Sequence, residues 1–292
     1  MPILIRKICV LFSNGLAYAL MKIFGRFMIV RIIARGCIRK EKKVICGDDV
    51  FQIKNPDKLL VDLKKFGFSR ELEVSQAVID ELVQFAHNNP VHAYMDKNLA
   101  FSIKFKDDYQ KQLGEDILVA FYPNLHEVKI FEDICNNPVL LNIARRYCGV
   151  SAECIASQMW WTFPADVNDE VRNKYAHFFH RDLDGYNFIK LFIYLTDVLQ
   201  GDGGHFFVAG SHKLGFIGSL KERFRISRIA DEIVYQRFGS ASVIEMTGAP
   251  GTVIVEDTFG LHKGQTPTKN PRLIASFVFG TRNYNNIQKY IA

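Results

Sequence analysis

Two short stretches of metal-ligand residues, about 80 residues apart, constrain the fold of this chain most strongly. The first is His180-Arg181-Asp182, and the second contains His262. Alternate residues of an extended segment face the same side, so His180 and Asp182 can act together while Arg181 points away. Two imidazoles and one carboxylate form the facial ligand set of a non-haem ferrous site, which leaves the opposite coordination positions open. The fold must therefore bring His262 onto the same rim as the first stretch.

Around these stretches lie segments rich in apolar, aromatic and β-branched residues, which favour strands. They are Cys154–Phe163, Phe188–Thr196, His205–Val208, Gly251–Glu256 and Arg272–Gly280. Antiparallel strands bring distant segments onto one rim, and a small barrel or jelly roll does this routinely. We therefore predict such a β core over residues 151–283.

The preceding residues, 44–150, are predicted to be a helical cover for this core. Residues 75–87 carry apolar side chains at helical spacing and stop at Asn88-Asn89-Pro90. A second helix is expected to begin at Asn137-Pro138, with proline at its first position, and to end at Gly149. The expected class is α+β, with one large domain over residues 44–292. Residues 164–174 and 209–242 are the expected lids or substrate-selecting loops.

The motif residues resemble the phytanoyl-CoA dioxygenase family of Fe(II)/2-oxoglutarate oxygenases, over roughly residues 58–282. The metal-binding His-x-Asp of that family falls on His180 and Asp182, its distal histidine on His262, and its 2-oxoglutarate arginine on Arg272. Its Gly-Ser-His-Lys segment falls on residues 210–213, preceded by alanine instead of the usual proline. The resemblance implies a double-stranded β-helix core of the jelly-roll or cupin kind, Fe(II), 2-oxoglutarate as cosubstrate, and O2.

The implied activity is a dioxygenase that converts 2-oxoglutarate to succinate and CO2 and hydroxylates an unactivated C–H bond. The planar guanidinium of Arg272 suits bidentate recognition of the far carboxylate of 2-oxoglutarate. Gln158 is a further candidate contact to this cosubstrate. Lys190 is another if it faces inward, and the alternative for it is a rim lysine with its ammonium in water.

Other interpretations of the same residues remain. The chain could be a non-catalytic jelly-roll binding module with a relic metal site, or a cupin-like metal enzyme that does not use 2-oxoglutarate. The odd offset of His177 from His180 turns it to the other face of a strand. His205 and His212 are expected to make structural hydrogen bonds.

The first 43 residues differ from the rest in charge. They hold ten Lys or Arg and one Glu, a net charge of +9, so the other 249 residues sum to −3 in a chain of +6. This localised charge does not favour a nucleic-acid partner. Lys22, Arg26, Arg31, Arg35 and Arg39 recur at four- or five-residue steps. They would lie near one face of a basic amphipathic helix whose remainder is apolar.

Such a helix is typical of an anionic membrane surface, and the alternative is packing on the barrel or on a second subunit. The uncharged run from residue 8 to 21 is too short for a confident spanning helix, and Ala17-Tyr18-Ala19 is a mediocre signal-peptide cleavage site. The six cysteines show no pairing pattern. We therefore expect a cytoplasmic protein, peripheral on the inner face of the membrane if residues 1–43 bind lipid. Its substrate would be a small molecule or a lipid-linked one, such as the sugar of a membrane glycolipid.

Overall fold

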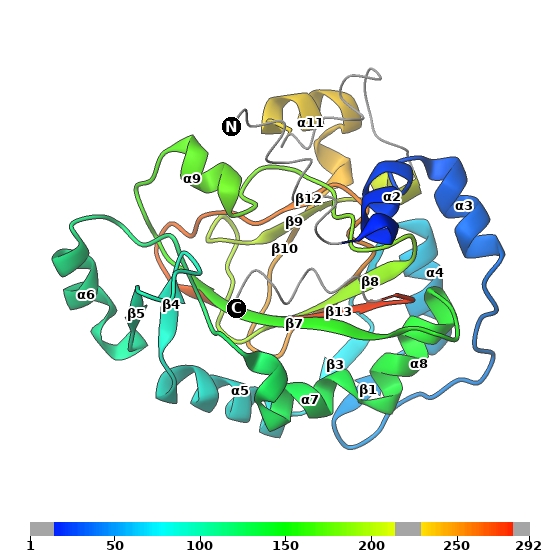
Figure 1. The fold of residues 1–292 in the computed structure, drawn as a ribbon, viewed down its shortest axis with the longest axis horizontal. Helices are drawn as coiled ribbons and strands as arrows, with labels where there is room; N and C mark the ends of the chain where they lie inside the picture. Colours follow the sequence, from blue (N-terminus) through cyan, green and yellow to red (C-terminus); the bar gives the residue numbers. More distant parts are fainter. Residues whose placement is uncertain (1–14, 214–228, 283–292) are drawn as a thin grey trace.

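The computed structural model describes residues 15–213 and 229–282, in which a larger and a smaller antiparallel sheet enclose a shared core (Figure 1). The strand order is β2-β11-β8-β13-β7-β6-β4-β5 in the larger sheet and β10-β9-β12 in the smaller one. The larger sheet contains β2 (Phe68–Ser69), β4 (Val91–Ala93), β5 (Ala100–Phe101), β6 (Val119–Phe121), β7 (Glu153–Thr162), β8 (Phe188–Tyr194), β11 (Val253–Glu256) and β13 (Arg272–Gly280). The smaller sheet contains β9 (His205–Val208), β10 (Val243–Met246) and β12 (His262–Lys263). A separate pair joins β1 (Phe51–Ile53) to β3 (Leu72–Val74).

The five predicted strands are confirmed as β7, β8, β9, β11 and β13. Two further strands, β10 and β12, were not predicted from the sequence. A two-residue strand such as β12 is too short to show any alternation of polar and apolar residues, and β10 includes the charged Glu245.

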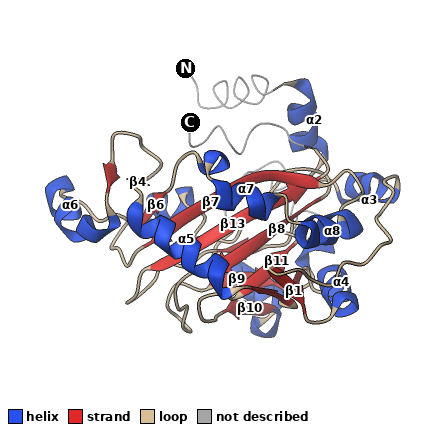
Figure 2. Cartoon of the chain, turned by 90° about the horizontal axis from the view of Figure 1, so that it is seen from below, coloured by secondary structure: helices blue, strands red, loops and turns tan. Residues whose placement is uncertain are grey.

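The larger sheet is buried on both faces, which explains why all nine residues of β13 are buried. One face presents Trp161, Leu273 and Phe277 to a core formed with the helices α5, α7 and α8 (Figure 2). The other face presents Phe192 and Ile274 to the smaller sheet. Two sheets packed over one apolar core form a sandwich of the jelly-roll kind. Trp160 and Trp161 lie on opposite faces, as alternation requires.

Both predicted helices are present, as α5 (Gln76–Asn88) and α8 (Pro138–Tyr147). The Asn137 side chain caps α8 by accepting hydrogen bonds from the backbone N–H of Val139 and of Leu140. The other helices after residue 43 are α4 (Pro56–Lys65), α6 (Lys106–Leu113), α7 (Lys129–Cys135), α9 (Asp169–Lys174) and α11 (Asp231–Phe238). Short 3-10 turns are η1 (Ile103–Phe105), η2 (Leu125–Glu127), η3 (Ser211–Lys213) and η4 (Ser240–Ser242).

Residues 44–150, expected to be mostly a helical cover, contain the helices α4 to α8 and also short strands. This half contributes β2, β4, β5 and β6 to the larger sheet. These strands have two or three residues each, so pairing with longer neighbours, and not a local pattern, makes them extended. The predicted loop 164–174 ends in α9, and the connection 209–242 contains α11, although its residues 214–228 lie outside the described part.

Residues 16–36 form two helices, α2 (Leu16–Phe24) and α3 (Met28–Gly36), where one basic amphipathic helix was expected over residues 1–43. The chain breaks between them at Gly25, which ends α2, and at the extended Phe27, which precedes α3. Residues 1–14 of the expected helix lie outside the described part. No helix in the described ranges combines the length and hydropathy needed to cross a bilayer.

Cations on α3 point into the protein. Arg31 is 0% exposed, lies over the Phe259 ring and donates to the Gly185 carbonyl. Arg35 pairs with the buried Asp257 at 2.5 Å, and the Tyr147 hydroxyl donates to the same carboxylate oxygen at 2.8 Å. Burial alone would raise the pKa of Asp257, but Arg35 and Arg31 outweigh it and lower that pKa.

Most of the large apolar side chains of the same two helices face outward, although Met21 is buried. The exposed large ones are Leu16, Leu20, Ile23, Phe24, Ile29, Ile32 and Ile33. The described part of the segment is therefore amphipathic with its cationic side against the barrel, which is the geometry of packing. Membrane binding by residues 1–43 stays a prediction, and α2 and α3 give it an apolar contact surface.

The buried Asp257 cluster gives a stability prediction. Asp257→Asn leaves the two buried guanidinium groups without their anion, and we expect the free energy of unfolding in urea to fall by about 3–5 kcal/mol. The control is Asp108→Asn, which removes an exposed pair with Lys111 and should cost less than about 1 kcal/mol. Equal small losses in both variants would contradict a central role for Asp257.

The lowered pKa of Asp257 also predicts how that difference depends on pH. The folded protein keeps this carboxylate ionised at pH values where the unfolded chain protonates it, so its contribution is complete above about pH 4. It is lost as the pH falls toward the lower pKa of the folded state. We expect the difference in unfolding free energy between wild type and Asp257→Asn to shrink over this acidic range. A difference that stays constant from pH 7 to pH 3 would argue against the pairing.

Candidate metal centre

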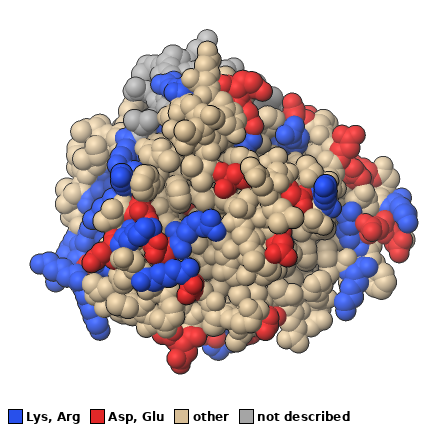
Figure 3. Space-filling view, turned by 180° about the vertical axis from the view of Figure 1, so that it is seen from behind, with Lys and Arg blue, Asp and Glu red and all other residues tan. Residues whose placement is uncertain are grey.

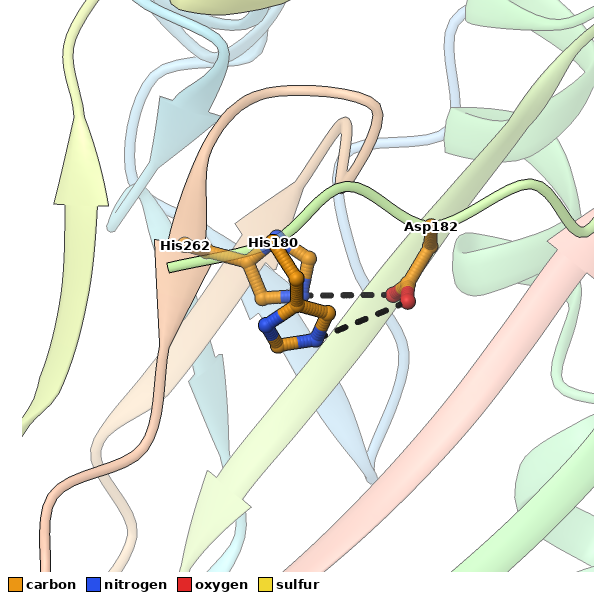
Figure 4. A group of neighbouring side chains, drawn as sticks. All are labelled: His180, Asp182 and His262. Atoms are coloured by element: carbon orange, nitrogen blue, oxygen red, sulfur yellow. Dashed lines mark ion pairs between the residues drawn. The ribbon is translucent and has the colours of Figure 1, made fainter. Parts of the chain in front are cut away.

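A backbone bridge holds the two distant histidines side by side. His180 N–H donates to the His262 carbonyl at 2.9 Å, and His262 N–H donates to the His180 carbonyl at 3.0 Å. Asp182 N–H donates to the Thr258 carbonyl at 2.9 Å, so both stretches are tied together again just beyond the bridge. Paired main chains therefore place all three side chains, although they come from segments about 80 residues apart (Figure 4).

One ligand atom from each of His180, Asp182 and His262 lies within 4.8 Å of the others. The Asp182 carboxylate is 3.7 Å from His180 Nε2 and 3.3 Å from His262 Nε2. His180 Nδ1 lies 3.0 Å from the Phe178 carbonyl, and His262 Nδ1 lies 2.9 Å from the Gly260 carbonyl. A carbonyl oxygen can only accept a hydrogen bond, so each Nδ1 carries a proton, and Nε2 is the ring nitrogen left to bind a metal.

Lys190 contacts the metal-ligand candidate Asp182 directly. Its ammonium lies 2.8 Å from Asp182 Oδ2 and 2.9 Å from Asp184 Oδ2. Burial alone would raise the pKa of Asp182, but Lys190 and then His262 outweigh it and hold that pKa well below its usual range. The two carboxylates likewise overcome burial and raise the pKa of Lys190. Asp182 is thus an ionised oxygen donor next to two ring nitrogens.

Arg272, the predicted cosubstrate arginine, is 3% exposed at the start of β13. Its guanidinium donates to the Gly203 carbonyl and, at 3.2 Å, to Thr162 Oγ1. Its Nε is buried without a hydrogen-bond partner, and no carboxylate in the described part of the chain pairs with it. Burial lowers the pKa of Arg272. A buried cation without an anion is a ready partner for a carboxylate ligand.

Local structure around Gly203 and the 268–270 loop orients Arg272. Gly203 has φ +84°, and a Cβ there would lie 2.8 Å from the Pro267 ring, so this turn requires glycine. Asp202 accepts backbone N–H groups of residues 268, 269 and 270, which fixes the approach to β13. Burial opposes ionisation of Asp202, but these hydrogen bonds lower its pKa.

Gln158 and Lys190 lie on the same face of the larger sheet as Arg272. In the strand register Arg272 pairs with Thr162, Ser276 pairs with Gln158, and Val278 pairs with Lys190. Partners in an antiparallel register point to one side, so these side chains face the space between the sheets. Among the described residues the half-buried Gln158 amide has no hydrogen-bond partner.

His177, His205 and His212 are not members of the three-residue ligand set and make other contacts. His177 Nδ1 contacts Thr266 Oγ1 at 2.8 Å, and His212 Nε2 contacts the Lys64 carbonyl. His205 Nε2 lies 2.9 Å from the buried Glu256 carboxylate, and its ring stacks on that of His262. The sequence analysis missed Glu256 and Asp184 as neighbours of the site. The only sequence signal for Asp184 was its even offset from Asp182, and for Glu256 a charge within an apolar strand.

These side chains fit a ferrous ion with an anionic cosubstrate. His180, Asp182 and His262 are the mixed nitrogen and oxygen donors of a facial triad, and two ring nitrogens are already oriented by backbone carbonyls. Independently of this triad, the buried Nε of Arg272 has no hydrogen-bond partner, which fits an anionic cosubstrate.

Comparison of the sequence with models of protein families gives no match, and comparison with curated proteins also gives none. Similar folds occur among solved structures. EctD from S. alaskensis with 2-oxoglutarate and 5-hydroxyectoine has a TM-score of 0.52 at 14% identity, covering 83% of this chain and 82% of that one. EctD with bound Fe has a TM-score of 0.51 at 14% identity, covering 83% of each chain. HygX from Streptomyces hygroscopicus with nickel and 2-oxoglutarate has a TM-score of 0.50 at 14% identity, covering 76% of this chain and 86% of that one.

At such identities the likeness shows a shared fold and leaves the site to be judged by its own residues. The predicted jelly-roll core in an α+β chain agrees with these neighbours. The resemblance to the phytanoyl-CoA dioxygenase family in particular stays a prediction.

The geometry predicts that His180 and Asp182 bind the metal and that His177 does not. His180→Ala or Asp182→Ala should weaken Ni(II) or Fe(II) binding by about 100-fold or more, since losing a ligand exceeds the 10–100-fold cost of losing a residue that only orients one. His177→Ala is the matched control and should bind metal as wild type does. Isothermal titration calorimetry measures this directly. Equal losses in all three variants would contradict the assigned ligand set.

Proposed function

We propose that this protein is an Fe(II)/2-oxoglutarate-dependent dioxygenase that hydroxylates an unactivated C–H bond. The observation that carries the proposal is the convergence of His180 Nε2, the Asp182 carboxylate and His262 Nε2 on one point. The structures that share this fold include ones crystallised with Fe or with 2-oxoglutarate. Their contents support the choice of metal and cosubstrate.

In this proposal His180, Asp182 and His262 hold the iron. When bound, iron supplies the activation of O2 that is coupled to conversion of 2-oxoglutarate into succinate and CO2. Arg272 holds the far carboxylate of 2-oxoglutarate through its free Nε and its planar fork. The guanidinium is already buried and oriented, so little ordering is needed when the anion arrives.

Gln158 and Lys190 complete the proposed cosubstrate site. The unpartnered Gln158 amide is free to donate to a carboxylate on the inner face of the sheet. Lys190 holds Asp182 Oδ2 in place and brings a positive charge beside the site of an anionic cosubstrate.

The proposed substrate is a small molecule, or the headgroup of a lipid-linked one such as a membrane glycolipid sugar. A cytoplasmic protein that touches the inner face of the membrane suits the lipid-linked option. The exposed apolar side chains of α2 and α3 support that option, because they offer a contact surface for lipid.

Production of succinate from 2-oxoglutarate tests the proposal. Wild-type protein with Fe(II) and ascorbate should form succinate even without substrate, and Asp182→Ala should form none. Arg272→Ala should raise the KM for 2-oxoglutarate by about 10- to 150-fold, the loss expected for a charge-assisted hydrogen bond of about 1.5–3 kcal/mol. His177→Ala should behave as wild type. Succinate and bound 2-oxoglutarate can be followed by NMR.

Two results would overturn the proposal. Wild-type protein that binds metal and 2-oxoglutarate without forming succinate, even with cell extract as a substrate source, would indicate a binding module. Oxidation of a substrate by Arg272→Ala without 2-oxoglutarate would indicate a cupin-like metal enzyme of another kind.

A further inference from the structure

A pocket formed by residues outside the metal centre, which we call the basic pocket, lies where α3, α4, α8 and η3 meet. It encloses about 130 Å³. Its lining residues are Arg35, Lys40, Lys64, Tyr147, His212 and Lys213. Tyr147 and His212 are buried and form its floor, whereas the three lysines are exposed at its rim. None of the proposed metal or 2-oxoglutarate ligands lines it.

Charge is the distinctive property of this pocket. Four of the six lining residues are cationic and none is acidic. The Asp257 carboxylate is fully buried and is already bonded to the lining residues Arg35 and Tyr147. Like charges so close together repel, and burial together with Lys64 and Arg35 lowers the pKa of Lys40.

The rim lysines also lack partners that other lysines of the chain have. Lys58 pairs with Asp62, Lys111 with Asp108, and Lys129 with Asp133. Within residues 15–213 and 229–282, by contrast, no carboxylate pairs with any of the three rim lysines. In the view of Figure 3, Lys and Arg side chains gather on the side of the molecule where α3 and α4 lie. Asp257 compensates Arg35, so the three rim lysines are the lining cations that no carboxylate of the described residues compensates.

We propose that this pocket binds the phosphoryl group of a ligand. A phosphate monoester carries nearly two negative charges at neutral pH and three acceptor oxygens. Three lysines without carboxylate partners around one small pocket match that charge and oxygen count better than they match a carboxylate, which has one charge and two oxygens. The site thus differs from the proposed cosubstrate site, where a single buried arginine faces one carboxylate.

The phosphoryl group could belong to a soluble phosphorylated compound or to a lipid headgroup. The pocket is bordered by α3, which also presents the exposed apolar residues Ile29, Ile32 and Ile33. A headgroup in the pocket would therefore place acyl chains near an apolar surface. A soluble phosphate ester would need the pocket alone.

Titration of the full chain with inorganic phosphate, with acetate as the competing carboxylate, tests the site in solution. We expect phosphate to bind and acetate not to displace it. The triple variant Lys40→Ala, Lys64→Ala, Lys213→Ala should bind phosphate about 100-fold more weakly, since each lysine near a phosphate contributes on the order of 1 kcal/mol. A triple Lys→Arg variant at the same positions keeps the charge and should keep the binding.

The matched control removes the same charge elsewhere. Lys97→Ala, Lys111→Ala, Lys129→Ala changes exposed lysines outside the pocket and should leave phosphate affinity unchanged. Arg272→Ala should also leave it unchanged, which separates this site from the metal centre. Absence of phosphate binding at low salt, equal losses in the two alanine triples, or loss in Arg272→Ala would each overturn the proposal.

Sedimentation with vesicles distinguishes the two sources of phosphate. Wild type that pellets with phosphatidylcholine vesicles containing phosphatidic acid, but not with phosphatidylcholine alone, would assign the pocket to a lipid headgroup if the pocket triple stays in solution. Binding of glycerol 3-phosphate without pelleting would assign it to a soluble ester. Pelleting that the pocket triple retains, together with no binding of soluble phosphate, would overturn the site.

Discussion

The pair of backbone hydrogen bonds between residues 180 and 262 is the constraint on which the metal centre depends. It makes two residues that are far apart in sequence direct neighbours, and it does so through main-chain groups that tolerate no change of register. The carbonyls of Phe178 and Gly260 then select the same tautomer in both rings. Ligand position and ligand protonation are thus both consequences of strand pairing.

Asp257 connects this centre to the rest of the molecule. It precedes Thr258, whose carbonyl holds Asp182, and it binds Arg35 of α3 and Tyr147 of α8. The same arginine and tyrosine line the basic pocket. Hydrogen bonds from Arg35 and Tyr147 to Asp257, and from Asp182 N–H to the adjacent Thr258 carbonyl, therefore connect the lining of that pocket to a proposed metal ligand.

Long elements with a clear pattern could be predicted from the sequence, whereas contacts that depend on pairing could not. The five strands and the helices α5 and α8 follow from apolar periodicity and from capping residues such as Asn137. The convergence of His180 with His262 followed from ligand chemistry, since a triad requires it. Lys190 was left undecided because a lysine after a strand start gives no sign of which face it takes, and only the register with Val278 resolves that. The direction of the α3 cations could not be predicted for a similar reason, because an amphipathic pattern does not say which side of a helix contacts the protein. Their partner, Asp257, lies 222 residues from Arg35 in the sequence.

The pairing of α3 with Asp257 has a consequence for how the chain matures on the ribosome. Arg35 and Asp257 are separated by 222 residues. At about 5–20 residues per second, more than about ten seconds pass between synthesis of the helix and synthesis of the carboxylate that neutralises it. During that interval the segment has both an unmatched cationic side and an apolar side in contact with its surroundings. The nascent protein therefore offers chaperones or lipid both sides of this segment, whereas in the folded protein the cationic side is packed against the barrel and the apolar side stays exposed.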